Sequence, residues 1–584
     1  MRLSSLIYIF FTSINNNNKN KSSSNIMSKI NGVCRVEIAK VEWDALQPWQ
    51  RSPQSKSIGT AFVIDGERLL TNAHVVKSAI DIRVRPHGST RRFPAKVVCY
   101  APDVDLALLE ILGENERAEF FNSATTNFGA NGNNDDTKRL RTTNSLEFAT
   151  SFPALQETIH VVGFPTGGRT ICVTEGVVSR IDIYNQIVAI QVDSAINPGN
   201  SGGPAFNSKG QVTGVAFRKR SSKKSQKVDN IGYLIPAVLI RAFLGRVNVK
   251  DGTYKLAGTI PYRFHSLENH SLRLAHKVPN SIHGILITSV ADTVTNDGHR
   301  LQAGDILTKI DGSQVADDGQ VVLRGDELIQ HAYLMRIKKK DEPVIFTIYR
   351  EGKEVVCHPY ILKDIPSIIP RFENVDYMPN YILLGSLVLL PFSSNLRNFN
   401  QCGSLLKADC IDYYRRWPRD WEGQSGLVVL TEIFAHELSF SYSRPWRRVI
   451  SYNGIKIKSL EHLQQLWTES CTLATSSDQQ DSTNNSNGSF TGDEKNDERS
   501  HMFARLELEN DDDIVFEVRS AMKAQVEVMA IHGTSFFRIL MRLYVPLLFS
   551  QHNLSSNNHL LLQQSVSLIR SFLRIQSIYD VNKN

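Results

Sequence analysis

Three short segments of the chain carry side chains that together could cleave an acyl bond. The segment TNAHVV places His74 after a predicted strand, DVDLAL places Asp105 at the start of another, and NPGNSGGP places Ser201 in a glycine-rich turn. An imidazole can act as a general base, a carboxylate can hold its tautomer, and a hydroxyl can attack a carbonyl carbon. The three segments therefore predict nucleophilic catalysis by a His-Asp-Ser triad.

The glycines around Ser201 allow the backbone to curl, so that successive N–H groups point at one spot. Such a spot is an oxyanion hole, in which the loss of one donor costs about 100- to 1000-fold in rate. We expect the N–H groups of Gly199 and Ser201 to form it. The order His, Asp, Ser is that of chymotrypsin, and it differs from the orders in subtilisin and the α/β hydrolases.

Each segment has an ordinary structural explanation when it is taken alone. His74 could be a histidine at the end of a strand, and the turn around Ser201 could be only a tight turn. Asp103 is an alternative to Asp105, although Asp105 directly precedes the apolar run 106–111, which would anchor it. The three segments in this order, on a β-rich background, favour the catalytic interpretation.

The elements around these residues are short strands. Between residues 59 and 111, and again between 159 and 235, β-branched runs alternate with Gly, Pro, Asp or Ser, which is typical of β-barrels or sandwiches. A helix over 237–244 closes the second set. The Asn-rich stretch 115–144 has too few apolar residues to order itself, so we expect it to be an inserted surface loop.

Smaller units follow the second set of strands. One runs from residue 262 to 363 and contains a predicted helix over 326–336. Another begins with the apolar stretch 381–392, which is too short to cross a bilayer and is predicted to be one buried strand. A polar tract over 475–500 interrupts this unit, which resumes at Met502. DILTKIDGSQV and RVISYNGIKI share a strand and a turn, which makes a weak internal repeat.

Composition limits the classes of protein that the chain can belong to. Its 584 residues are too many for one core, and 41% hydrophobic and 21% charged residues are typical of soluble globular domains. Seven scattered cysteines predict neither a disulfide framework nor a zinc site, and favour a reducing compartment or an organelle interior. We expect no cofactor or metal, because the chain has no phosphate loop and no cluster of ligands.

The net charge of +7 is modest, and one basic run stands out at residues 218–227. A nucleic-acid surface is weakly supported there, and a solvated loop is the favoured interpretation. No acidic residue precedes Glu37, which suits a transit peptide for a chloroplast or mitochondrion. The alternatives are a disordered leader, with Met27 as the start, and a location in the nucleus or cytosol. No membrane span is predicted.

The motifs resemble those of the Deg/HtrA family of ATP-independent serine proteases. TNAHVV, DLALLEI and NPGNSGGP carry the resemblance, together with VVGFP, EGVVS and NIGYLIP, and it extends over about residues 55–533. It implies a mainly β protein, with a chymotrypsin-like double β-barrel followed by two PDZ-like α+β domains. It also implies that His74, Asp105 and Ser201 are catalytic.

The resemblance and the strand pattern together give the expected domain boundaries. We expect a leader over 1–45, the protease domain over 46–248 with a polar insertion at 113–146, and a first PDZ-like domain over 252–364. A second PDZ-like domain over 376–533 would contain a low-complexity insertion at 472–500. A helical tail would occupy 534–584.

The resemblance further assigns residues that would bind substrate. The backbone from Gly214 through Val215 and Ala216 to Arg218 would pair with an extended substrate. The specificity pocket would be shaped by part of the NIGYLIP segment, namely Ile231, Gly232, Tyr233 and Ile235. Because that segment has no acidic residue, the pocket is predicted to prefer an aliphatic side chain over Arg or Lys before the scissile bond.

Two departures from the family bear on peptide binding. In the first PDZ-like domain, the loop that receives a terminal carboxylate falls at Ile260-Pro261-Tyr262, where Pro261 replaces the usual glycine and removes an N–H donor. The second domain has Asn453-Gly454 without a preceding Gly-Asp pair, which favours an assembly role.

The predicted function is hydrolysis of peptide bonds in unfolded or damaged proteins, with PDZ-like modules for substrate binding or assembly. Homotrimers or larger assemblies are implied by the family. One alternative is a non-catalytic chaperone or scaffold that gathers peptides through its PDZ-like domains. Another is a processing enzyme with a single protein substrate.

Overall fold

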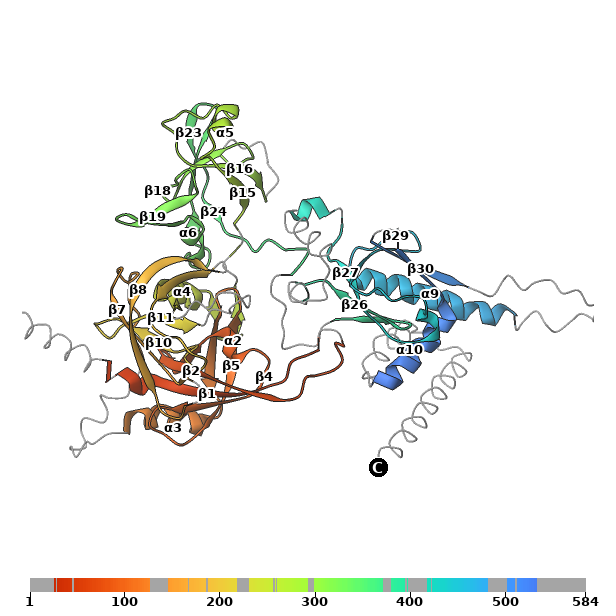
Figure 1. Ribbon diagram of the computed structural model, residues 1–584, viewed down its shortest axis with the longest axis horizontal. Coiled ribbons are helices and arrows are strands. Elements are labelled where there is room, and N and C mark those ends of the chain that lie inside the picture. The colour runs from red at the N-terminus through yellow and green to blue at the C-terminus, as the bar shows by residue number, and fades with distance from the viewer. Residues whose placement is uncertain are drawn as a thin grey trace, which may run out of the picture. The chain divides into compact units, whose positions relative to one another are not determined.

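The computed structural model in Figure 1 describes most of the chain between residues 26 and 532. The described residues are 26–27, 29–44, 47–126, 145–165, 168–184, 187–217, 231–255, 258, 260–291, 299–370, 380–393, 396, 417–421, 423–481, 502–509 and 512–532. The basic run 218–227 and the expected helical tail 534–584 lie outside them. The described residues form two compact units, which consist of residues up to 41 with 53–366, and residues 42–52 with those from 367 onward.

The first barrel is closed by six antiparallel strands. Its order is β1-β2-β3-β6-β5-β4. The strands are β1 (Val33–Lys40), β2 (Ser55–Ile64), β3 (Arg68–Thr71), β4 (Ala79–Pro86), β5 (Phe93–Ala101) and β6 (Leu106–Ile111). One set of side chains fills the barrel, and the short helix α2 (Ala73–Val76) directly follows β3.

Two expectations for this region were wrong. The leader was expected to reach residue 45, but β1 already belongs to the barrel, because Cys34, Val36 and Ile38 alternate into its core. The stretch from Asn115 was expected to be a loop, but helix α3 (Glu114–Thr126) forms there. Phe120 is fully buried against Phe93, with ring centroids 5.2 Å apart, so two aromatic residues order an otherwise polar segment.

The second barrel repeats the six-stranded closure in the order β10-β11-β12-β9-β8-β7. The strands are β7 (Thr158–Gly163), β8 (Cys172–Tyr184), β9 (Ile187–Val192), β10 (Pro204–Phe206), β11 (Val212–Phe217) and β12 (Gly232–Pro236). Helix α4 (Ala237–Leu244) follows β12 and buries Leu239, Ile240 and Phe243. The predicted double β-barrel is confirmed.

A short hairpin of β13 (Val247–Asn248) and β14 (Thr253–Tyr254) leads from α4 into the first PDZ-like domain. That domain has a sheet in the order β15-β16-β17-β22-β23, with β18 paired to β17 and two small two-stranded sheets. Its elements are β15 (Tyr262–Ser266), α5 (His270–Ala275), β16 (Ile285–Val290), β17 (Ile306–Ile310), β18 (Ser313–Gln314), β19 (Gln320–Arg324), β20 (Glu327–Gln330), α6 (Ala332–Arg336), β21 (Pro343–Val344), β22 (Phe346–Arg350), β23 (Lys353–Val356) and β24 (Tyr360–Ile361).

The predicted helix over 326–336 is therefore wrong in its first half. Residues 327–330 pair with β19 as strand β20, and the exposed Leu328 alternates with the buried Ile329. Gly325, with φ +49°, makes the turn between the two strands. Only residues 332–336 are helical.

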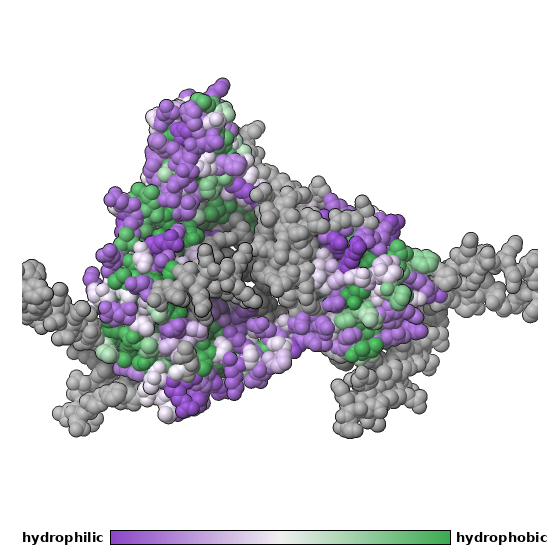
Figure 2. All heavy atoms as spheres, viewed as in Figure 1, coloured by the Kyte–Doolittle hydropathy of each residue, from purple (hydrophilic) through white to green (hydrophobic). Residues whose placement is uncertain are grey.

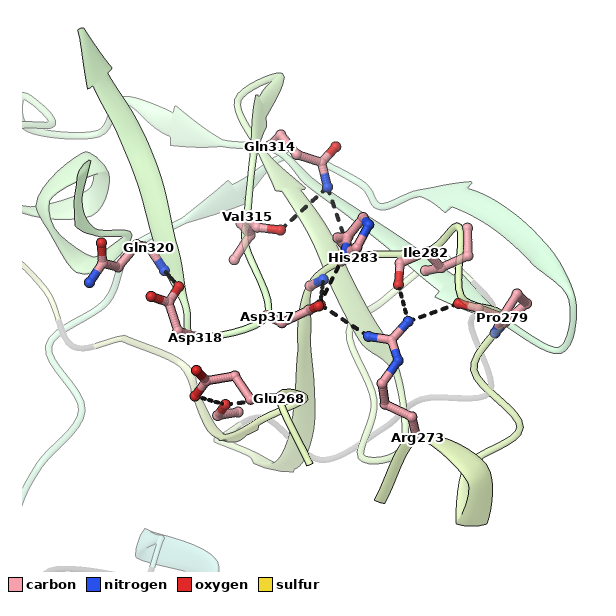
Figure 3. Close-up of polar contacts among 12 residues, drawn as sticks. Glu268, Arg273, Pro279, Ile282, His283, Gln314, Val315, Asp317, Asp318 and Gln320 are labelled. Carbon is pink, nitrogen blue, oxygen red and sulfur yellow. Dashed lines mark hydrogen bonds and ion pairs between the residues drawn. The ribbon is translucent and has the colours of Figure 1, made fainter. Parts of the chain in front are cut away.

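Polar side chains fix the end of this domain that contains α5 (Figure 3). The buried Arg273 binds Asp317 Oδ1 at 3.1 Å and donates to the carbonyl oxygens of Pro279 and Ile282 at 2.8 and 2.6 Å. His283 Nδ1 lies 3.0 Å from Asp317 Oδ2, and the N–H of Gly284 donates to Oδ1 at 3.0 Å. Hydrophilic side chains also cover much of this end on the face in Figure 2.

The C-terminal unit is built on a larger sheet in the order β25-β26-β27-β28-β30-β31, with β29 paired to β28. Its elements are β25 (Ile382–Leu384), β26 (Leu387–Pro391), β27 (Val428–Ile433), β28 (Arg447–Tyr452), β29 (Ile455–Lys456), α9 (Leu460–Asp481), β30 (Phe503–Leu508), β31 (Asp512–Glu517) and α10 (Val518–His532). Residues 42–52 also belong to this unit. Trp49 is buried there, and its Nε1 donates to the carbonyl oxygen of His532 at 3.2 Å.

Two further expectations were wrong in this unit. The stretch 381–392 is a hairpin and not one strand, because Gly385, with φ +59°, turns the chain between β25 and β26. The low-complexity insertion was expected from residue 472, but α9 continues to Asp481. The hydroxyls of Thr472 and Thr475 donate to carbonyl oxygens four residues earlier, which keeps these polar residues compatible with a helix.

Two kinds of feature are absent from the described residues. Within these ranges, no helix combines the length and the hydrophobicity that a membrane span needs. The same ranges contain no group of three or more His, Cys, Asp or Glu side chains placed to hold a metal ion.

Candidate active site

His74 and Asp105 meet at the end of the first barrel. His74 Nδ1 lies 2.7 Å from Asp105 Oδ2, and the backbone N–H of His74 donates to Asp105 Oδ1 at 2.9 Å. The carboxylate therefore binds both the ring and the backbone of the same histidine. With Nδ1–H directed at Asp105, His74 presents Nε2 as the proton acceptor. The side chains are 45% and 17% exposed, so the imidazole is accessible while the carboxylate is sheltered.

The backbone also fixes the loop that carries Asp105. Its carbonyl oxygen accepts from the N–H of Ala73 at 3.1 Å and from Asn72 Nδ2 at 3.0 Å. Asp105 adopts φ +54°, a left-handed conformation that aspartate tolerates better than most residues. Tertiary contacts hold that conformation, because the loop is bonded to the same segment that carries His74.

The structure also distinguishes Asp105 from Asp103, the alternative left open by the sequence. Asp103 Oδ2 accepts from the phenol of Tyr254 at 3.0 Å, and among the described residues Asp103 forms no hydrogen bond or ion pair with His74. Burial raises the pKa of Asp103. The hydrogen bond from Tyr254 and the positive charges of Arg336 and Arg246 lower it, but they offset the increase only in part. Asp105 is therefore the partner of the histidine.

Ser201 lies in a tight turn that requires glycine on both sides. Gly199 has φ +103° and Gly202 has φ +85°, conformations that L side chains rarely adopt. A Cβ at Gly202 would lie 2.1 Å from the carbonyl oxygen of Thr60, and one at Gly199 would lie 2.2 Å from that of Phe164. The glycine-rich turn therefore packs directly against backbone of both barrels.

Thr60, on strand β2, is a site residue that the sequence analysis missed. Its hydroxyl donates to the carbonyl oxygen of Gly199 at 2.7 Å and accepts from the N–H of Phe164 at 3.1 Å. Its backbone N–H donates to the carbonyl oxygen of Ser201 at 2.9 Å. Thr60 thus fixes the turn on both sides of Asn200. A threonine in a strand gives no local signal of this role.

The same strand connects the serine turn to the histidine segment. The hydroxyl of Thr71, two residues before Ala73, donates to the carbonyl oxygen of Thr60 at 2.8 Å. A Cβ at Gly202 would lie 2.3 Å from that hydroxyl and 3.2 Å from the N–H nitrogen of Asn72. Residues near 60, 71–74 and 199–203 are therefore assembled at one place.

Within the described residues, no hydrogen bond joins the hydroxyl of Ser201 to the ring of His74. Catalytic hydrogen bonds are often long in proteases without substrate and tighten when substrate binds. In the same part of the chain, no backbone carbonyl accepts from the N–H of Gly199 or Ser201. Both donors expected for the oxyanion hole are thus available.

The expected substrate-binding strand needs a correction. Gly214 and Val215 pair with β12 on one side and with β10 on the other. Ala216 pairs with Leu234, while its carbonyl oxygen accepts from the N–H of Gly202 and its N–H donates to Gly203. These three backbones have no free edge for a substrate. Pairing would have to begin at Phe217, and Arg218 lies outside the described residues.

The residues expected to line the specificity pocket have different environments in the structure. Ile235 is fully buried in the core and does not line an open site. Tyr233 stacks on Tyr184 with ring centroids 4.6 Å apart. Gly232 faces Ile196, whose side chain would lie 2.7 Å from an added Cβ, so Gly232 leaves room for that isoleucine. Ile196, which lies five residues before Ser201, was not among the residues expected in the pocket.

Comparisons with known proteins agree with this architecture. A family model described as a trypsin-like peptidase domain matches residues 59–215, and a PDZ domain model matches residues 369–536. The first match includes the segments with His74, Asp105 and Ser201. The second begins before β25 and ends four residues after α10, so it covers the sheet of the C-terminal unit.

Curated relatives cover most of the chain. The protein is 34% identical to "Protease Do-like 4, mitochondrial" of Arabidopsis thaliana, across 78% of this chain and 81% of that protein. It is 32% identical to "Protease Do-like 2, chloroplastic" of the same plant, across 75% of this chain and 68% of that protein. A "Serine protease DegP homolog" of Plasmodium falciparum is 24% identical over 74% of this chain. With its double barrel, its PDZ-like domains and these relatives, the chain belongs to the Do-like (Deg/HtrA) family of serine proteases and is a serine endopeptidase.

Proposed function

We propose that Ser201 is the nucleophile, His74 the general base and Asp105 the residue that orients the imidazole. Ser201 Oγ attacks the scissile carbonyl while His74 Nε2 takes its proton, and the same nitrogen then gives that proton to the leaving amine. A water molecule that His74 deprotonates then attacks the acyl group and releases it from Ser201 as a carboxylate. Asp105 holds the Nδ1–H tautomer and stabilises the imidazolium. The N–H groups of Gly199 and Ser201 receive the oxyanion. The observation that carries this assignment is the doubly bonded pair of His74 and Asp105 beside the glycine-rich turn.

The test compares the full chain with Ser201→Ala on casein, with Ser208→Ala as a matched control on an exposed residue of the same barrel. We expect Ser201→Ala to lose measurable cleavage and the control to keep it. A fluorophosphonate probe should label the wild-type protein and the control, but not Ser201→Ala. Equal casein cleavage by the wild type and Ser201→Ala would refute the assignment and would revive the chaperone alternative, which the relatives named as proteases do not favour.

The substrates that we propose are unfolded or damaged proteins, because an extended segment must enter the cleft to reach Ser201. The contact of Ile196 with Gly232 and the absence of an acidic residue from NIGYLIP support a preference for aliphatic side chains before the scissile bond. Cleavage-site profiling on an unfolded protein tests this preference, and a majority of sites after Arg or Lys would contradict it. Digestion of casein at many sites would argue against a processing enzyme with one substrate.

For the first PDZ-like domain we propose peptide binding along the edge strand β15. Its neighbour Pro261 has no N–H, and its carbonyl oxygen already accepts from Ala291 at 2.7 Å, so capture of a terminal carboxylate is not favoured there. The second domain would serve assembly, and we propose a homotrimer or larger oligomer. Sedimentation of the full chain measures the oligomer.

An organelle is the proposed location, because the relatives are named mitochondrial or chloroplastic and the first 36 residues contain no acid. These names give no support to the nucleus or cytosol. A fluorescent fusion of residues 1–60 distinguishes a chloroplast from a mitochondrion.

A further inference from the structure

The hairpin β13–β14 hydrogen-bonds to the turn that carries Asp105. The phenol of Tyr254 in β14 donates to Asp103 Oδ2 at 3.0 Å, and the Tyr254 ring lies 5.5 Å from that of Phe243 in α4, centroid to centroid. We propose that Asp103 is a positioning residue, which Tyr254 holds so that the turn keeps Asp105 aligned with His74. This inference rests on the proposed triad and adds two residues that do not touch substrate.

The turn that carries Asp105 needs a restraint from its neighbours because the backbone conformation of Asp105 is unfavourable. Asp105 has φ +54°, and non-glycine residues in that region persist where surrounding structure holds them. Between Asp103 and Asp105 lies Val104, which is buried in the core. After Asp105, the chain enters β6. Asp103, Val104 and Asp105 are thus held by a phenol, by the core and by the histidine segment.

The carboxylate of Asp103 should lower the free energy of unfolding, so a contribution to stability does not explain why an aspartate occupies this position. Its Oδ1 is buried and has no hydrogen-bond partner among the described residues. The charged and titratable groups that influence it or are influenced by it are Tyr254, Arg246, Arg336 and Cys99. A buried carboxylate with one hydrogen bond costs free energy relative to a neutral side chain. A neutral isostere should therefore stabilise the protein.

The same hairpin region reaches the first PDZ-like domain through Arg246. This arginine is 4% exposed, and it donates to the carbonyl oxygen of Arg336 at 3.0 Å and to that of Lys338. These carbonyls belong to the last residue of α6 and to the segment that follows it, where a cation is favourable. Through the hairpin β13–β14, the partly buried Asp103 and Tyr254 and the buried Arg246 thus connect the catalytic turn to α6.

The experiment measures kcat and KM of the full chain on one fluorogenic peptide, with active sites counted by the fluorophosphonate probe. Asp103→Ala and Tyr254→Phe should each lower kcat per labelled site, by about tenfold for the alanine variant, while KM stays within about twofold, because misplaced catalytic groups slow the chemical step. Asp103→Asn keeps an acceptor for Tyr254 and should retain most of kcat. Tyr442→Phe is the matched control, because among the described residues the Tyr442 hydroxyl bonds only to Val515 in the C-terminal unit, and kcat should not change.

Coupling between the two residues is the deciding readout. The double variant Asp103→Ala with Tyr254→Phe should be no slower than Asp103→Ala alone, because both changes remove the same hydrogen bond. Losses that multiply, or an unchanged kcat in both single variants, would overturn the inference. If Asp103→Ala does not fold, Asp103→Asn and Tyr254→Phe still decide it.

A stability measurement separates positioning from folding. Because the pKa of Asp103 is raised in the folded state, the wild type is penalised as pH rises through that pKa, so Asp103→Asn should melt at a higher temperature near neutral pH. The gain should fade in acid, where Asp103 is protonated. A lower melting temperature of Asp103→Asn at neutral pH would overturn the argument that Asp103 serves position and not stability. Loss of cleavage in Ser201→Ala, with unchanged kcat in both Asp103→Ala and Tyr254→Phe, would refute this inference alone.

Discussion

Two aspartate–histidine pairs occur in the described part of the chain with nearly the same local geometry. In the first barrel, Asp105 binds His74 Nδ1 at 2.7 Å and a backbone N–H at 2.9 Å. In the first PDZ-like domain, Asp317 binds His283 Nδ1 at 3.0 Å and the N–H of Gly284 at 3.0 Å (Figure 3). The histidines are similarly exposed, at 45% and 58%.

The surroundings of the two pairs differ. Asp317 also binds the buried guanidinium of Arg273, so its charge is already neutralised and it fixes the loops around α5. Among the described residues, no Lys or Arg forms an ion pair with Asp105, and its charge remains available to an imidazolium on His74. Only His74 lies beside a glycine-rich turn with a serine. An aspartate–histidine pair is therefore not a catalytic site until a nucleophile and free N–H donors stand next to it.

The largest expected difference between the two pairs is in kcat, when the charge of each aspartate is removed in a separate variant. Asp105→Asn should lower kcat by about 10⁴-fold, because the amide no longer holds the correct tautomer or stabilises imidazolium. Asp317→Asn should leave kcat within about twofold. Kinetics on the fluorogenic peptide measure both variants, and equal losses of kcat would break the distinction between the two pairs.

For stability we expect the opposite order, with a larger effect of Asp317→Asn than of Asp105→Asn. Asp317→Asn should lower the free energy of unfolding by about 1.5–3 kcal/mol at neutral pH, because the buried Arg273 loses its charged partner. Burial raises the pKa of Asp317, but His283, the N–H of Gly284 and Arg273 outweigh it, and the net shift is downward.

This stabilisation should be present above the unfolded pKa, near pH 4, and lost as pH falls through the lower folded pKa. Denaturant unfolding of the wild type and Asp317→Asn from pH 7 to pH 3 tests the sign. A difference between them that grows in acid would contradict it.

A smaller effect on kcat is expected when the turn that carries Ser201 is altered, because this turn distinguishes the first pair from the second. Thr60→Val removes the bonds to Gly199 and Phe164 without changing shape, and we expect kcat to fall about tenfold because the oxyanion donors lose their support. Thr213→Val in the second barrel is the matched control, because the buried hydroxyl of Thr213 has no partner within the described residues. Equal kinetics of the two variants would show that Thr60 does not hold the turn.

Local sequence determined most strands of both barrels, although not β1, and the three segments of the site. β3, β6 and β9 lie where short apolar runs such as LALLEI predict them, because a short apolar segment between turn residues is buried most readily as a strand. The glycines at 199 and 202 predicted a tight turn, because residues with a side chain rarely adopt the positive φ angles found there. The sequence also set the order of His, Asp and Ser, which indicated the family.

Tertiary structure alone decided which groups meet. Choosing Asp105 over Asp103 depended on Tyr254, about 150 residues away, and the support of the serine turn came from Thr60 on another strand. Phe120 ordered a polar helix because Phe93 covers it, and Trp49 joined the C-terminal unit although it precedes β2 in the chain. These outcomes arise from contacts between distant residues, whose free energies are absent from any local pattern of propensity or hydrophobicity.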